Sequence, residues 1–200
     1  MKTGIMGGTF NPIHSGHIMV ADVVKEELGL DEVIFILAGE PWLKAGTSII
    51  SAEHRLNMLR LAIAGKSHFR TSTIEIERKG PTYSVDTVAQ MSREIDDSDK
   101  LFFIIGWDKL MELPRWHQPK RLISLCQLVA VPRVGFPVPD LASLEASIPG
   151  ITQRVIMLDK FHVDISASVI RERVRQRLPI SHLVPEAVER YIEENGLYRE

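Results

Sequence analysis

Short apolar runs alternate with helix-period segments along the whole chain. Runs with little polar alternation are typical of strands covered on both faces, and segments with apolar residues at helical spacing are typical of amphipathic helices. Such repeats imply right-handed strand–helix–strand crossovers and a mostly parallel sheet, with ligands beyond the carboxyl ends of its strands. The runs predict strands at 4–6, 32–38, 101–105, 125–131 and 155–158. The periodic segments predict helices at 16–28, 52–64, 84–95, 140–147, 168–177 and 185–195.

Capping residues and a Pro/Gly-rich segment support these boundaries. Ser51 and Ser84 each precede an acidic residue by two positions, an arrangement in which the hydroxyl caps a helix and the carboxylate favours its positive end. The Pro/Gly-rich segment 132–139 is interpreted as a surface loop, because a strand–helix pattern resumes after it. The 200 residues, 44% of them hydrophobic, predict a single domain over 1–200 with a helical C-terminal part from about 166 to 200.

The composition limits the kinds of molecule that this protein is expected to bind. The net charge of −2 and the absence of a Lys/Arg run disfavour a nucleic-acid polymer, and no apolar stretch is long enough to predict a membrane span. The single cysteine, Cys126, cannot form an internal disulfide and lies in an apolar run, which favours a buried, inert thiol in a reducing compartment. We therefore expect a cytoplasmic protein, and the sequence leaves open whether it forms homo-oligomers.

The segment GGTFNPIHSGH, residues 7–17, is the strongest candidate for chemistry. Gly7 and Gly8 follow the first predicted strand, and their missing Cβ atoms allow backbone N–H groups to approach a bulky anion. The segment contains neither G-x-G-x-x-G nor G-x-x-x-x-G-K-[ST], so it is not an ordinary dinucleotide or P-loop signature. Taken alone, the two glycines favour a plain turn.

His14 and His17 are three residues apart at the start of a predicted helix, so both rings can lie on one side of its N-terminus. Cations there oppose the helix dipole, which makes sense if a polyphosphate binds. Two alternatives stay open. A zinc pair would need Cys partners or an H-E-x-x-H arrangement that the segment lacks, and two partly buried histidines bonded to backbone carbonyls fit the spacing equally well.

GGTFNPIHSGH resembles the G-G-[ST]-F-[DN]-P-x-H-x-G-H signature of the nucleotidylyltransferase superfamily, with every position filled. The rest of the chain is similar to one family within it, the bacterial nicotinate-mononucleotide adenylyltransferases. The resemblance implies a doubly wound, Rossmann-like fold. It also implies transfer of AMP from ATP to nicotinate mononucleotide, giving deamido-NAD and pyrophosphate. The similar stretches are AGEPWLK (38–44), HRLNMLRLAI (54–63), GPTYSVDTV (80–88), FIIGWDKLMELPRWH (103–117), ISASVIRERV (165–174) and LVPEAVERYIEENGLY (183–198).

The resemblance implies an ATP side built on two helix starts. His17 would stabilise the α-phosphate in the transition state, Lys44 would lie near the phosphates, and Arg171 would sit on the first turn of a second helix. This chain has Trp42 and Leu43 where many relatives have proline and histidine, and Ala167 where they have a hydroxyl residue. The catalytic residues implied are His14, His17, Lys44 and Arg171, and those implied to bind ATP are Gly7, Gly8, Thr9, Phe10, Gly16, Ser166 and Ser168.

The mononucleotide side is implied by other segments. The start of the predicted helix at Ser84 offers free N–H groups to the nicotinate carboxylate, Asp108 is implied to bond a ribose hydroxyl, and Trp116 could stack on the pyridine ring. A helix cap at Asp108 and simple packing of Trp116 are the structural alternatives. The residues implied to bind the mononucleotide are Lys44, Thr82, Tyr83, Ser84, Asp108 and Trp116. Mg²⁺ would arrive with ATP, held by phosphate oxygens and water rather than by a protein cage.

Two other functions compete with this one. A related enzyme could use nicotinamide mononucleotide or phosphopantetheine as the acceptor; the chain length and GPTYSVDTV argue against the latter. A non-catalytic nucleotide sensor could keep the fold, although loss of a histidine or of Arg171 would favour that reading and none is lost.

Overall fold

The computed structural model describes residues 1–39, 49–96, 98–159 and 163–199. Its centre is a six-stranded sheet in which every pairing is parallel. The strands are β1 (Lys2–Gly8), β2 (Glu32–Leu37), β3 (Phe69–Ser72), β4 (Lys100–Gly106), β5 (Gln127–Val131) and β6 (Val155–Met157).

The strand order is β3-β2-β1-β4-β5-β6, so the winding direction reverses between β1 and β4. The register pairs Ile5 with Ile34 of β2 on one side and with Phe103 of β4 on the other. This order defines a doubly wound α/β sheet whose ligand crevice lies beyond the carboxyl ends of the strands at the reversal. The predicted α/β fold with a parallel sheet is confirmed.

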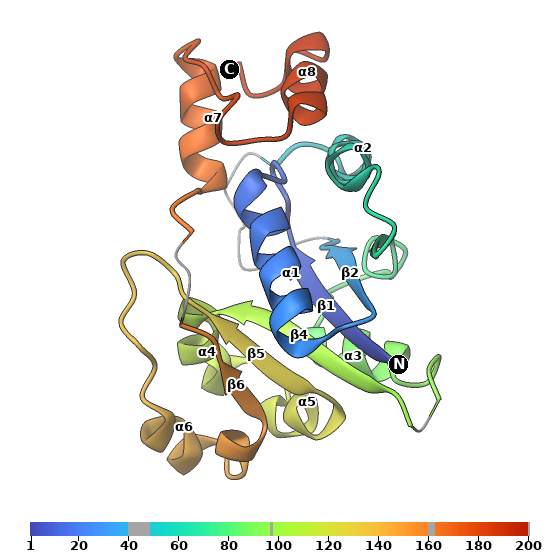
Figure 1. Ribbon diagram of the computed structural model, residues 1–200, viewed down its shortest axis with the longest axis vertical. Helices are drawn as coiled ribbons and strands as arrows, with labels where there is room; N and C mark the ends of the chain where they lie inside the picture. The colour runs from blue at the N-terminus through green and yellow to red at the C-terminus, as the bar shows by residue number, and fades with distance from the viewer. Residues whose placement is uncertain (40–48, 97, 160–162, 200) are drawn as a thin grey trace.

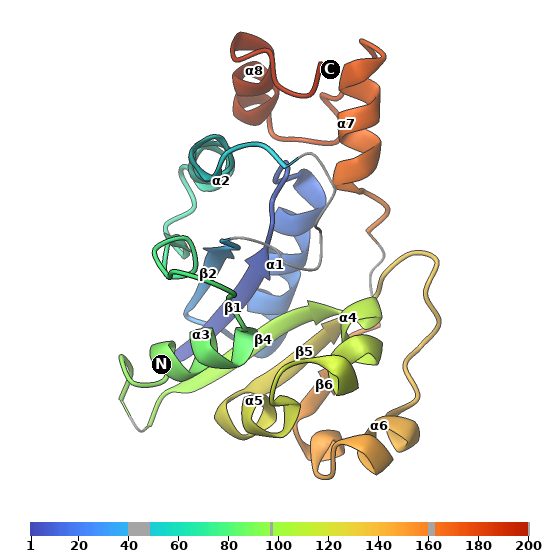
Figure 2. The same cartoon turned by 180° about the vertical axis from the view of Figure 1, so that it is seen from behind.

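Helices cover both faces of the sheet. α1 lies over one face, while α3, α4 and α5 lie over the other, which Figure 2 brings to the front (Figures 1 and 2). No helix in the described parts has both the length and the apolar character to cross a membrane. The helices of four or more residues are α1 (Ser15–Leu28), α2 (Ala52–Ile63), α3 (Ser84–Met91), α4 (Trp107–Glu112), α5 (Pro119–Leu125), α6 (Leu141–Ser147), α7 (Ala167–Arg175) and α8 (Glu186–Glu194).

Alternate residues of each strand feed two separate cores. On β4, Phe102 and Ile104 pack in the cluster under α1, α2, α7 and α8, whereas Phe103 and Ile105 pack in the cluster under α3 to α6. Near-continuous apolar strands follow from this arrangement, because both faces exclude water. Cys126 lies in the second cluster, where burial raises the pKa of its thiol to about 12, in line with the expected inert side chain.

The sequence missed three elements. β3 has one buried apolar residue, Phe69, and lies at an edge of the sheet, so it leaves no apolar run. α4 and α5 have six and seven residues, too short to show a helical period. The predicted strand at 125–131 starts instead at Gln127, because α5 extends through Leu125.

Helix α3 begins at Ser84, as predicted, but its capping residue and its last residue differ from the prediction. Its N-cap position is Tyr83, without a side-chain hydrogen bond, so the predicted cap at Ser84 is wrong. It ends at Met91 because the following amides, of Arg93 and Glu94, bond to carbonyls three residues back rather than four. The predicted cap of α2 is confirmed, since the Ser51 hydroxyl accepts from the backbone N–H of His54 at 3.3 Å.

Candidate functional site

A cleft with a volume of about 660 Å³ opens at the carboxyl ends of β1 and β4. Its position is the one that the reversal of the strand order predicts. Most of the candidate residues lie on its wall, although they come from four separate segments of the chain. These are Gly7, Gly8, Thr9, Phe10, His14, Gly16, His17, Thr82, Ser84, Asp108, Trp116 and Arg171.

Three of the candidate residues in the described ranges do not line this wall. Ser166 and Ser168 are bonded to each other at 3.1 Å, and Ser166 accepts from the backbone N–H of Val169 as the N-cap of α7. The ring of Tyr83 stacks instead on that of His117, with centroids 4.2 Å apart. Lys44, together with Trp42 and Leu43, lies outside the described residues.

The two histidines form one unit at the start of α1. His14 is the N-cap residue and His17 the third residue of the helix, and their rings stack with centroids 3.6 Å apart. The backbone N–H of His14 donates to Nδ1 of His17 at 3.3 Å. The predicted placement of both rings on one side of a helix start is confirmed.

His14 is not a cation at neutral pH. Its side chain is 3% exposed, and Nδ1 has no hydrogen-bond partner within the described residues. Burial and, to a lesser degree, the nearby charge of Arg133 lower its pKa to about 4. The expectation that both rings would oppose the helix dipole as cations is therefore wrong for His14, whose burial no sequence pattern shows.

The glycines at the end of β1 serve packing. Gly7 and Gly8 still pair with Ile36 and Leu37 of β2, so the prediction that they follow the strand in a turn is wrong: both belong to β1. A Cβ on Gly8 would lie 2.7 Å from the Phe10 ring. Phe10 follows with φ +46°, a left-handed conformation that persists only where neighbouring contacts hold it.

Phe10 ties this turn to the histidines. Its ring is 3% exposed and meets the His17 ring edge-on, with centroids 5.1 Å apart. Gly16 has a similar steric role, because a Cβ there would lie 2.5 Å from Val163 and 3.1 Å from Nδ1 of His14. The histidine pair thus sits in a tightly filled pocket that fixes both rings.

Arg171 reaches the same turn from α7. It is the fifth residue of the helix, just past the first turn on which it was expected, and its Nη1 donates to the Asn11 carbonyl at 2.8 Å. Five N–H donors on a guanidinium leave capacity for a ligand beside this bond. The structure therefore brings His14, His17 and Arg171 to one cleft.

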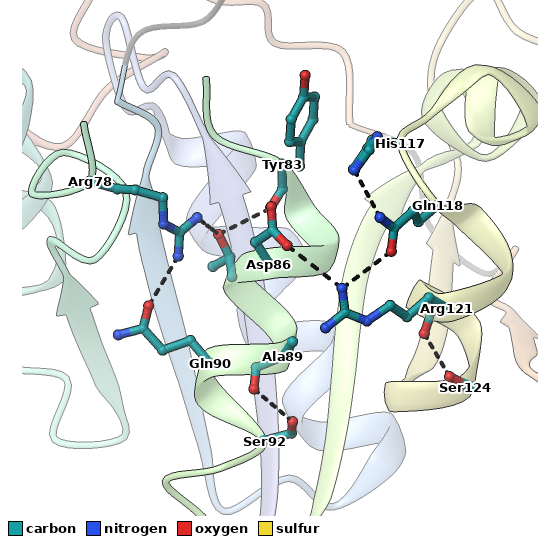
Figure 3. Close-up of polar contacts among 11 residues, drawn as sticks. Arg78, Tyr83, Asp86, Ala89, Gln90, Ser92, His117, Gln118, Arg121 and Ser124 are labelled. Carbon is teal, nitrogen blue, oxygen red and sulfur yellow. Dashed lines mark hydrogen bonds and ion pairs between the residues drawn. The ribbon is translucent and has the colours of Figure 1, made fainter. Parts of the chain in front are cut away.

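The opposite end of the cleft lies at the start of α3. Thr82 and Ser84 line it together with Glu75, which the sequence did not single out. The Thr87 hydroxyl donates to Glu75 at 2.8 Å and accepts from Arg78, which also donates to Gln90. Figure 3 shows Arg78 spanning toward α3. Burial is the main influence on the pKa of Glu75 and raises it.

The two remaining candidate residues are Asp108, in α4, and Trp116, which precedes α5. Asp108 is the second residue of α4, whose N-cap is Gly106, so the alternative of a simple cap at Asp108 is wrong. Trp116 meets Phe103 edge-on at 6.3 Å between centroids. The Arg121 guanidinium of α5 lies 3.9 Å from the Asp86 carboxylate of α3, an exposed ion pair between the two helices (Figure 3).

Metal-ligating side chains do not gather in the described parts of the chain, where no three His, Cys, Asp or Glu residues form a group that could hold an ion. Charged residues that the sequence did not predict do line the cleft: Glu75, Lys109, Glu112 and Arg133. Arg133 was assigned to a surface loop, although its place just after β5 is a position where ligand-binding residues are found in such sheets.

The parallel α/β sheet and its cleft at the strand reversal define the class of protein. Residues 5–173 match the model of the cytidylyltransferase-like family, and the chain belongs to this family of nucleotidyltransferases. Its relatives include the probable nicotinate-nucleotide adenylyltransferase of Dehalococcoides mccartyi, 52% identical over 99% of this chain and 97% of that protein. The nicotinate-nucleotide adenylyltransferase of Bacillus subtilis is 38% identical over 98% of each chain. Within the family, the chain belongs to the nicotinate-nucleotide adenylyltransferases.

The fold is shared with solved structures at low sequence identity. Plasmodium falciparum nicotinic acid mononucleotide adenylyltransferase complexed with NaAD superposes with a TM-score of 0.79 at 19% identity, covering 98% of this chain and 97% of that one. The same protein complexed with APC gives a TM-score of 0.76. The predicted Rossmann-like nucleotidylyltransferase fold is therefore confirmed.

Proposed function

We propose that this enzyme transfers the adenylyl group of ATP to nicotinate mononucleotide, giving nicotinate adenine dinucleotide and pyrophosphate, as a step of NAD biosynthesis. The observation that carries the proposal is the convergence of His14, His17 and Arg171 on one cleft. The names and full-length similarity of the relatives support the choice of acceptor.

The chemistry required is alignment and charge stabilisation. A phosphate oxygen of the mononucleotide attacks the α-phosphorus of ATP, and pyrophosphate leaves from the opposite side. Because Nδ1 of His17 accepts from a backbone N–H, the neutral ring carries its proton on Nε2, from which it can donate to a phosphate oxygen. Arg171 adds a permanent positive charge to the same end of the cleft.

The other roles divide along the cleft. Gly7, Gly8, Thr9, Phe10 and Gly16 would form the wall against ATP, with Lys44, Ser166 and Ser168 as further phosphate contacts. Thr82, Tyr83, Ser84, Asp108 and Trp116 would serve the mononucleotide, with its carboxylate at the start of α3. Mg²⁺ enters as part of the ATP substrate, carried on phosphate oxygens and water. The compartment we propose is the cytoplasm, where a single buried thiol stays reduced.

Pyrophosphate release measured with ATP and each of three acceptors tests the proposal. We expect nicotinate mononucleotide to exceed nicotinamide mononucleotide, and phosphopantetheine to give no turnover. His17→Ala should lower turnover about a hundredfold, the scale of losing one fixed charge stabiliser. His182→Ala, at an exposed position away from the cleft, is the matched control. ATP binding without pyrophosphate for any acceptor would contradict the proposal and support a nucleotide sensor.

A further inference from the structure

The turn between β1 and α1 is held by contacts from three distant parts of the chain. Phe10, at its centre, has a left-handed backbone conformation that side chains of its kind rarely adopt. Such a conformation persists only when its surroundings fix it. The contacts that fix it therefore also determine where the cleft-lining residues Thr9 and Asn11 lie.

The residue before Phe10 is fixed by Arg55. This arginine is 3% exposed, and its Nη1 donates to the carbonyls of Thr9 and Ala38, both at 2.9 Å. Its Nε donates to the carbonyl of Ile50 at 3.2 Å. A buried guanidinium with three backbone partners acts as a rigid strut between α2 and the turn.

The residue after Phe10 is fixed by the C-terminal segment. The hydroxyl of Tyr198 donates to Oδ1 of Asn11 at 2.8 Å, and Arg171 donates to the carbonyl of the same residue at 2.8 Å. Asn11 is 5% exposed, so these bonds are shielded from water. Hydrogen bonds thus bracket Phe10 on both sides.

The Tyr198 hydroxyl lies within the electrostatic reach of both arginines. The charges of Arg171 and Arg55 act on Tyr198, while burial has the larger influence and raises its pKa. The hydroxyl consequently stays protonated and remains a donor to Asn11. The Tyr198 side chain therefore bonds to the turn and lies within electrostatic reach of the two arginines that also bond to it.

We propose that Tyr198 is a positioning residue for adenylyl transfer: with Arg55 on the other side, it holds the Thr9–Asn11 turn, and through it Arg171, in the geometry that the reaction needs. The effect on kcat that this proposal predicts rests on the proposed function, whereas its effect on backbone amide exchange in the turn does not. Tyr198 ends a stretch that resembles the family, 183–198, but the sequence assigns it no role, because its partner Asn11 lies 187 positions away.

The test compares two tyrosines of the same C-terminal segment. Tyr198→Phe removes only the hydroxyl that reaches the turn. Tyr191→Phe is the matched control, because its hydroxyl bonds to His54 and Asn57 of α2, both at 3.0 Å, rather than to Asn11. Tyr198→Phe loses one bond that docks this segment and Tyr191→Phe loses two, so a purely structural role predicts an effect in Tyr191→Phe at least as large as that in Tyr198→Phe.

We expect backbone amide exchange in residues 9–17 to accelerate in Tyr198→Phe and to match the wild type in Tyr191→Phe. We also expect kcat to fall about tenfold in Tyr198→Phe, with KM for ATP changing less than kcat, since displacement of a positioned group lowers turnover steeply. Arg55→Lys keeps the charge but not the geometry of the three hydrogen bonds, so it should accelerate exchange in the same residues. If Tyr198→Phe does not fold, the exchange measured in Arg55→Lys tests whether these contacts position the turn.

Unchanged exchange in residues 9–17 for both Tyr198→Phe and Arg55→Lys would overturn the positioning role, and so would equal losses of kcat in the two tyrosine variants. Failure of the proposed function looks different. In that case the wild type releases no pyrophosphate, while the exchange difference between the tyrosine variants is still measurable.

Discussion

The imidazole ring of His14 lies flat on that of His17, with the centroids 3.6 Å apart and the ring planes inclined by 27°. Two positive charges at this separation would repel strongly in a buried setting. The lowered pKa of His14, about 4, resolves this conflict, because the pair then carries at most one positive charge at neutral pH. The pair therefore presents Nε2 of His17 to a phosphate, with the neutral His14 ring stacked on it. Arg171 supplies the permanent positive charge.

The lowered pKa of His14 predicts a pH-dependent stability. Above about pH 6.5 the histidine is neutral in the folded and unfolded states, so it has no effect. As the pH falls from 6.5 toward 4, the unfolded state takes up a proton that the folded state does not, and the free energy of unfolding falls by up to about 3 kcal/mol. Urea denaturation across this range should show a smaller loss for His14→Gln. Parallel curves for the two proteins would exclude the shift.

The steric fit of Gly8 predicts a packing defect. In Gly8→Ala the new Cβ would lie 2.7–2.8 Å from two carbons of the Phe10 ring, which is buried against His17. We expect a loss of about 1–3 kcal/mol in the free energy of unfolding, as in overpacked cores. Gly7→Ala is the control, because its Cβ would meet only Phe103, at 3.9 Å. Equal stabilities of the two variants would show that the Phe10 ring moves freely.

The Thr87 hydroxyl predicts a local stability cost at the other end of the cleft. Thr87 is 2% exposed, and Thr87→Val keeps its shape while removing the donor to the half-buried Glu75 carboxyl. We expect a loss of about 1 kcal/mol in the free energy of unfolding, the usual net contribution of one hydrogen bond.

The control is the residue that follows the same helix. The Ser92 hydroxyl donates to the Ala89 carbonyl at 3.1 Å (Figure 3). Ser92→Ala should change the free energy of unfolding by less than about 0.5 kcal/mol. Guanidinium denaturation of both variants provides the comparison, and a loss in Ser92→Ala equal to that in Thr87→Val would remove the special role of the Glu75 bond.

The fold was predictable where burial leaves a pattern. The central strands are covered on both faces, so β1, β2, β4 and β5 appear in the sequence as apolar runs. β3 was not predicted, because an edge strand needs fewer apolar residues and Phe69 alone does not form an apolar run. Helix ends were harder still, since the early end of α3 depends on a change in hydrogen bonding that composition does not encode.

The site was predictable where a motif concentrates its residues. The segment 7–17 identified both histidines, and the resemblance of the stretch 165–174 to the same family identified Arg171, which the structure brings to the same cleft. Glu75 and Arg133 escaped because only tertiary packing places them there. The state of His14 escaped for the same reason: its pKa depends on burial and on Arg133, which lies 119 positions later.

The bond between Asn11 and Tyr198 joins positions 187 apart in the chain. On a translating ribosome, the two histidines emerge early, and even a nascent polypeptide that has grown through α7 still lacks the hydroxyl that anchors Asn11. Assembly of the catalytic pocket thus trails the synthesis of its catalytic groups, and a growing chain cannot complete this bond before residue 198 has left the exit tunnel.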